Sequence, residues 1–157
     1  MPTARSAMLE SSLLLLGCVL FGAAIVADLA RRWIPDSIPL GLLGLFVLYV
    51  LLADASAMAL LWAHVLTAAV LLLVGFALFV LDGLGGGDGK LLAVAGLWVG
   101  PYDIMFFLFG LGLLSLGLTL FALLPFASTR RLRSNLPFAV AIAPPAMVLL
   151  TLRAFSL

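Results

Sequence analysis

The chain has 157 residues, of which 66% are hydrophobic and 10% are charged, and its formal net charge is +1. A soluble domain carries about 25% charged residues, so this composition excludes a water-soluble globule and a disordered chain. It predicts an all-α polytopic membrane protein that forms a single transmembrane domain over residues 1–157. The single cysteine, Cys18, excludes a disulfide framework and a cysteine-ligated zinc site. The nearly neutral charge gives no indication of nucleic-acid binding.

Apolar segments recur along the whole sequence. A helix that crosses a bilayer needs about 20 apolar residues. On this basis the expected spans are Met8–Ala27, Ile38–Ala53, Ala57–Leu81, Leu91–Gly100, Asp103–Leu124 and Pro137–Arg153. The second and fourth are short, and for the fourth a half-span buried inside the bundle is the alternative.

The basic residues indicate how many segments cross and in which direction. With six spans, one side holds Arg31, Arg32, Lys90, Arg130, Arg131 and Arg133, and the other side holds Arg5 and Arg153. Cytoplasmic loops carry the excess of Lys and Arg, so the larger group is assigned to the cytoplasm. If Leu91–Gly100 does not cross, the groups become equal and indicate no orientation. The charges therefore favour six transmembrane helices with both termini on the outer face.

Acidic residues at membrane depth are functional candidates, because burying a carboxylate in a bilayer is costly. Asp54 and Asp103 are expected in outer turns, and Glu10 near the outer end of the first span, where water can solvate them. Asp28 ends the first apolar run and Asp88 opens the fourth segment. In the six-span topology these two lie at the same depth on the cytoplasmic side.

Two carboxyl groups that share a site cannot both ionise easily, so one keeps a proton and the pair titrates together. Such a pair can activate a water with one carboxylate and protonate a leaving amine with the other. Asp28 and Asp88 are therefore a candidate catalytic pair. The alternative is that both are boundary residues near helix ends, without chemistry.

The segment from Asp82 to Lys90 has five glycines between positions 83 and 89. This content is expected to prevent a stable helix and to let another backbone approach closely, which suits the docking of an extended peptide. A phosphate-binding loop would need Gly where Leu84 stands and Ser or Thr where Leu91 stands, so that alternative fails. A passive hairpin between spans remains possible on this pattern.

The sequence around both aspartates resembles a known family. Gly85-Gly86-Gly87-Asp88 fits the Gly-x-Gly-Asp signature of membrane aspartyl proteases, and its continuation through Lys90 is similar to prepilin leader peptidases. Asp28, with Arg32 four residues later and then Ile34-Pro35, is similar to the first aspartate motif of that family. Asp36 stands where the family usually has Asn, and Ala139 where it usually has Gly. With one cysteine and no cysteine-rich zinc domain, the chain looks like the short branch associated with tight-adherence (Flp-type) pili.

This resemblance implies an aspartic endopeptidase of the bacterial inner membrane whose active site faces the cytoplasm. It would cleave the basic leader from prepilin or pseudopilin precursors, using a water activated by Asp28 and Asp88, without metal or cofactor. The residues expected to contact the substrate are Gly85, Gly86, Gly87, Gly89, Lys90, Asp36 and Asp82. Asp36 and Asp82 are the candidates for holding the positive charge of the leader.

The remaining polar residues receive structural interpretations. Lys90 either favours the ionised form of Asp88 or contributes to the charge bias between the two sides. Arg31 and Arg32 are expected to bind anionic lipid headgroups. His64 and Cys18 are expected to pack inside the bundle, His64 with a hydrogen bond. A small ion- or proton-coupled transporter that uses the same aspartates, and an inactive assembly scaffold, are the alternative functions.

Overall fold

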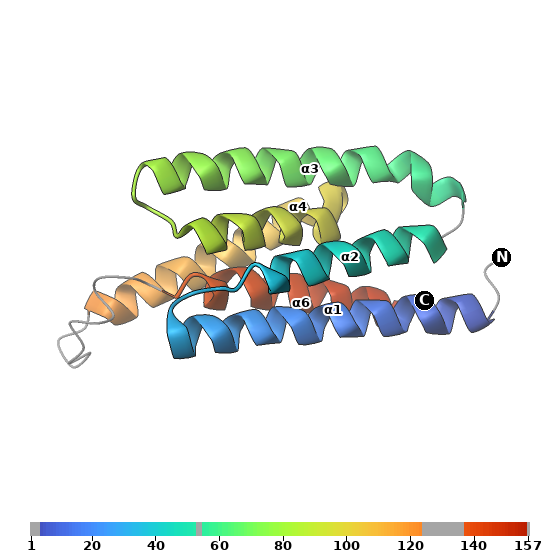
Figure 1. Ribbon diagram of the computed structural model, residues 1–157, viewed down its shortest axis with the longest axis horizontal. Coiled ribbons are helices and arrows are strands. Elements are labelled where there is room, and N and C mark those ends of the chain that lie inside the picture. Colours follow the sequence, from blue (N-terminus) through green and yellow to red (C-terminus); the bar gives the residue numbers. More distant parts are fainter. Residues whose placement is uncertain (1–3, 53–54, 124–136, 157) are drawn as a thin grey trace.

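The structure, a computed structural model, describes residues 4–52, 55–123 and 137–156, and in these ranges all of its regular secondary structure is helical, with short connectors between the helices. The helices are α1 (Ala4–Arg31), α2 (Ser37–Leu52), α3 (Ala55–Val80), α4 (Gly86–Leu123) and α6 (Ala139–Ser156). They lie side by side along one long axis and form a bundle (Figure 1). The all-α prediction is therefore confirmed.

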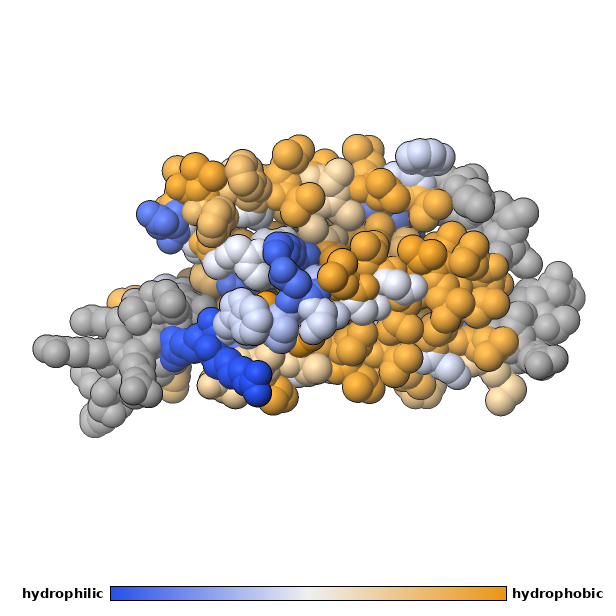
Figure 2. All heavy atoms as spheres, viewed as in Figure 1, coloured by the Kyte–Doolittle hydropathy of each residue, from blue (hydrophilic) through white to orange (hydrophobic). Residues whose placement is uncertain are grey.

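The bundle has the surface of a membrane protein. Four helices, α1, α3, α4 and α6, are long and apolar enough to cross a bilayer, and α2 is a shorter apolar helix. Large apolar side chains cover most of the face in Figure 2, and the hydrophilic ones gather toward the end where α1 finishes and α4 begins. Large apolar surfaces of this kind fit lipid rather than water.

Helix α4 is interrupted at Gly100, where φ is 70°, and Pro101 follows. Before the interruption, Trp98 packs beside Gly17 of α1 and Leu150 of α6. After it, Gly110 contacts Pro145, which lies earlier in α6. The chain therefore turns back at Gly100 and α4 has two arms, visible as the reversal at the yellow segment in Figure 1.

The two arms correspond to two of the expected spans, Leu91–Gly100 and Asp103–Leu124. Most of the first arm is buried, as expected for a half-span inside the bundle. The second arm carries many exposed apolar side chains. Six crossings remain a prediction; α1 begins and α6 ends at the same end of the bundle, which is compatible with it (Figure 1).

Arg153 satisfies the backbone carbonyl groups that the interruption exposes. Its guanidinium donates to the oxygens of Trp98 at 2.8 Å and Val99 at 2.5 Å, and to Asp103 Oδ2 at 2.5 Å. Unsatisfied carbonyl groups cost several kcal/mol in a bilayer, so this single cation stabilises the reversal. Asp103 lies directly after the reversal, as expected for a turn residue, but it is a half-buried partner of Arg153 and not a carboxylate held by water alone.

His64 of α3 completes the same region. Its Nδ1 lies 2.8 Å from the carbonyl oxygen of Leu97, and its ring packs 5.9 Å from that of Phe46. Trp98 adds a hydrogen bond from Nε1 to the Leu42 oxygen at 3.1 Å. The expected hydrogen-bonded packing role of His64 is confirmed, as is the burial of Cys18.

Three of the basic residues used to orient the chain, Arg130, Arg131 and Arg133, lie outside the described residues, and the side chain of Arg5 is not described either. Asp54, expected in an outer turn, also lies outside the described residues. Arg31 and Arg32 lie together at the end of α1.

Replacement of Gly100 by alanine tests the reversal. The new Cβ would overlap the His64 ring, and a φ of 70° strains a residue with a side chain. We expect Gly100→Ala to lower the free energy of unfolding by about 3 kcal/mol, measured by thermal or chemical unfolding in detergent. Gly112→Ala, in the same helix with open space around it, is the matched control and should unfold like the wild type. Equal stability of both variants would contradict the assignment.

Candidate active site

Asp28 lies in the last turn of α1 and is 6% exposed. Its Oδ2 accepts a hydrogen bond from the backbone N–H of Ala139 at 3.0 Å. Ala139 is the first residue of α6, so the Asp28 carboxylate caps the N-terminus of a helix more than a hundred residues away. A negative group at a helix N-terminus is stabilised by the backbone dipoles and the unpaired N–H groups.

Asp88 lies in the first turn of α4. Its carboxylate interacts with the backbone of Gly85, the residue that precedes the helix. A third-position acid that reaches back to the capping residue is one half of a capping box. A Cβ at Gly85 would lie 2.7 Å from Asp88 Oδ2, so the glycine leaves the room that this carboxylate occupies.

The two carboxyl groups lie at the same end of the bundle, close enough for the charge of Asp28 to act on Asp88. Asp88 Oδ1 is buried, and among the described residues it is the one buried side-chain oxygen or nitrogen without a hydrogen-bond partner. Buried polar atoms are almost always paired. An unpaired carboxylate oxygen beside a second carboxylate is therefore suited to hold a water or a substrate group.

The glycine-rich segment differs from its prediction. Gly86, Gly87 and Gly89 form the first turn of α4 instead of a non-helical loop. Tertiary packing overrides the low helix propensity, because a Cβ on Gly75 of α3 would lie only 3.0 Å from the Gly89 Cα. A Cβ on Gly87 would lie 3.3 Å from that of Ile34. The missing side chains thus let the start of α4 approach its neighbours, as small residues do between membrane helices.

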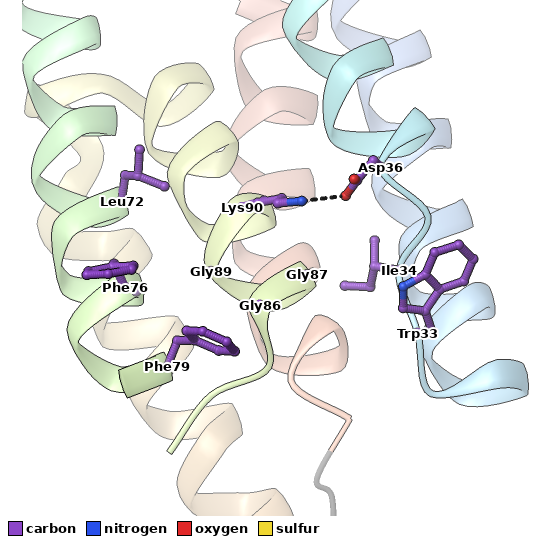
Figure 3. A pocket seen from close by; sticks show the side chains of 11 residues that line it. Trp33, Ile34, Asp36, Leu72, Phe76, Phe79, Gly86, Gly87, Gly89 and Lys90 are labelled. Carbon is purple, nitrogen blue, oxygen red and sulfur yellow. Dashed lines mark hydrogen bonds and ion pairs between the residues drawn. The ribbon is translucent and has the colours of Figure 1, made fainter. Parts of the chain in front are cut away.

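A groove opens beside this turn, between α3 and the α1–α2 connector (Figure 3). Its cavity of about 560 Å³ is lined by Trp33, Ile34, Asp36, Leu72, Gly75, Phe76, Phe79, Gly86, Gly87, Gly89 and Lys90. The structure therefore brings five of the expected substrate-contacting residues to one place. Gly85 is beside Asp88 instead, and Asp82 is exposed in the turn after α3, outside the lining.

Lys90 and Asp36 form an ion pair of 2.7 Å across this groove. The sequence left two roles open for Lys90, which were to favour the ionised form of Asp88 or to contribute to the charge bias between the two sides. The structure adds a third role, because Asp36 is the direct partner of Lys90. Both side chains are more than half exposed, at 53% and 63%.

Sequence reasoning missed several residues of this region. Ile34 is 3% exposed and packs over Gly87, and Leu72, Phe76 and Phe79 form the α3 wall of the groove. Ile34 was part of the motif that follows Asp28, but its sequence position did not predict that it would line the groove. The α3 residues had no signal, because that helix is apolar on all sides and its sequence marks no inner face.

Residues 14–121 match the model of the type IV leader peptidase family. The chain belongs to this family. The matched range contains Asp28, Asp88 and the groove beside them, and it agrees with a multi-pass membrane peptidase. No curated protein and no solved structure matches the chain.

The structural contribution of Asp28 can be measured separately from any chemistry. Asp28→Asn keeps an oxygen that accepts from the Ala139 N–H, whereas Asp28→Ala removes it. We expect Asp28→Ala to lose about 1 kcal/mol more stability than Asp28→Asn, as helix caps do. Thermal unfolding of both variants in detergent checks this, and equal melting temperatures would show that the cap contributes nothing.

Proposed function

We propose that this member of the family is an aspartic endopeptidase that removes the basic leader from prepilin or pseudopilin precursors. The observation that carries the proposal is the unpaired, buried Oδ1 of Asp88 beside the buried carboxyl group of Asp28. Membership of the type IV leader peptidase family supports the reaction class. The family match gives no support to the transporter alternative.

In the proposed reaction, a water held by the two carboxyl groups attacks the carbonyl carbon of the scissile peptide bond. The ionised carboxylate takes a proton from the water, and the protonated partner gives its proton to the leaving nitrogen as the C–N bond breaks. Neither aspartate forms a covalent bond to the substrate. The bond between Asp28 Oδ2 and Ala139 holds one carboxyl group in place during these steps.

The position of the site suits a substrate that is part membrane helix and part soluble leader. Asp28 ends α1 and Asp88 begins α4, at the end of the bundle where hydrophilic side chains gather (Figure 2). The positive-inside rule assigns this end to the cytoplasm of an inner-membrane protein. The leader would remain in the cytoplasm, and the apolar helix of the precursor in the bilayer. A Flp-type pilin is the substrate expected from the sequence resemblance.

Removal of either carboxylate tests the proposal. Asp28→Asn and Asp88→Asn should each lower cleavage of a co-expressed prepilin by about 10²- to 10⁴-fold, because each removes a proton donor or acceptor. Cleavage is measured by the mobility shift and mass of the pilin in membranes. The matched control is Glu10→Gln, which removes a half-buried carboxylate from the other end of α1 and should leave cleavage unchanged. Wild-type cleavage by either aspartate variant would refute the mechanism.

A further inference from the structure

The Asp36–Lys90 ion pair joins two parts of the chain that flank the candidate site. Asp36 lies in the connector between α1 and α2, and Lys90 lies in the first turns of α4. Both side chains are more than half exposed. Exposed ion pairs contribute little to stability, so this pair can separate without unfolding the bundle.

The pair stands between two apolar cavities. One, of about 560 Å³, borders Gly86 and Gly87; the other, of about 320 Å³, extends along Leu40 and Leu43 of α2. Asp36, Leu72 and Lys90 line both cavities. A chain that lies along both cavities must therefore pass the ion pair, which Figure 3 shows joining α4 to the α1–α2 connector.

The Asp36–Lys90 ion pair lies close to the candidate catalytic residue Asp88. Ile34, in the connector that carries Asp36, packs against Gly87, the residue before Asp88. Gly87 and Gly89, the two neighbours of Asp88 in the sequence, line the groove together with Asp36 and Lys90, whereas Asp88 itself is not part of the lining.

The groove holds one charge of each sign, and the excess positive charge lies outside its lining. Asp36 is the one acidic side chain in the lining of the two cavities, and Lys90 is the one basic side chain. Arg31 and Arg32 add positive charge at the start of the connector. A basic leader is repelled by these cations, and in the groove the carboxylate of Asp36 is its complementary partner.

We propose that Asp36 is a specificity-determining residue that binds a basic side chain of the leader, and that Lys90 occupies Asp36 until the substrate displaces it. This inference rests on the proposed function and goes beyond it by assigning an exchange of partners at one carboxylate. No covalent bond is made or broken in the exchange; an ammonium or guanidinium group of the leader replaces the Lys90 ammonium group on Asp36.

The exchange predicts opposite effects of two substitutions. Asp36→Asn removes the acceptor, so KM for a basic leader peptide should rise, by up to about fivefold as for an exposed charge pair. Lys90→Met removes the competitor, so KM for the same peptide should fall by a similar factor. If the pair only fastens the connector to α4, both substitutions break the same link and shift KM in the same direction.

The experiment uses the full chain in detergent or nanodiscs and two precursor peptides. One peptide has a basic leader, and the other has its Lys and Arg residues replaced by Gln. Wild-type enzyme should prefer the basic peptide, Asp36→Asn should lose that preference, and Asp36→Glu should restore it. Increasing salt should raise KM for the basic peptide with the wild type and much less with Asp36→Asn.

Two results would overturn the exchange while the wild type still cleaves. One is a shift of KM in the same direction for Asp36→Asn and Lys90→Met. The other is an equal rise of KM for the basic and the neutral peptide in Asp36→Asn. Failure of the wild type to cleave either peptide would count against the proposed function itself. Thermal unfolding of each variant verifies that the compared proteins are folded.

Discussion

Helix ends buried in a lipid-facing bundle must find partners inside the protein, because the bilayer core offers no water to their free N–H and C=O groups. Among the described residues, four side chains meet this requirement, and one of them is His64 beside the Leu97 oxygen. Asp28 accepts from the start of α6, Asp88 interacts with the backbone before α4, and Arg153 donates to the carbonyl groups exposed at Gly100. The reversal of α4, the position of α6 and the meeting of the two aspartates all depend on these contacts.

The same need for hydrogen-bond partners at helix ends accounts for the positions of the two candidate catalytic aspartates. A carboxylate is a natural partner for a helix N-terminus, and α4 and α6, like α2, begin toward this end of the bundle. Asp28 belongs to a helix that ends there, and Asp88 to one that begins there. The glycines of the first turn of α4 let it approach α3 and the connector, at the end of the bundle where the charge of Asp28 acts on Asp88. A capping arrangement thus brings together two acids with one oxygen left unpaired.

The ion pairs Arg153–Asp103 and Lys90–Asp36, both within the described part of the chain, have different surroundings. Arg153 and Asp103 are half-buried, and the arginine also binds two carbonyl oxygens, so separating this pair would leave several polar groups without partners. Lys90 and Asp36 are more exposed and lie across an apolar groove beside the glycine turn. The first pair is suited to hold a fold together. The second is suited to exchange its partner for a charged ligand.

The sequence by itself determined the all-helical membrane class, because hydropathy summed over long segments is a local property of the chain. It also indicated Asp28 and Asp88, because a carboxylate at the edge of an apolar run is rare for a physical reason that needs no structure. Only the tertiary structure decided the partners: Ala139 for Asp28, Arg153 for Asp103 and Asp36 for Lys90. It also decided that glycines 86, 87 and 89 are helical. These outcomes depend on packing between distant segments, and helices that are apolar on all sides carry no periodic signal of which faces meet.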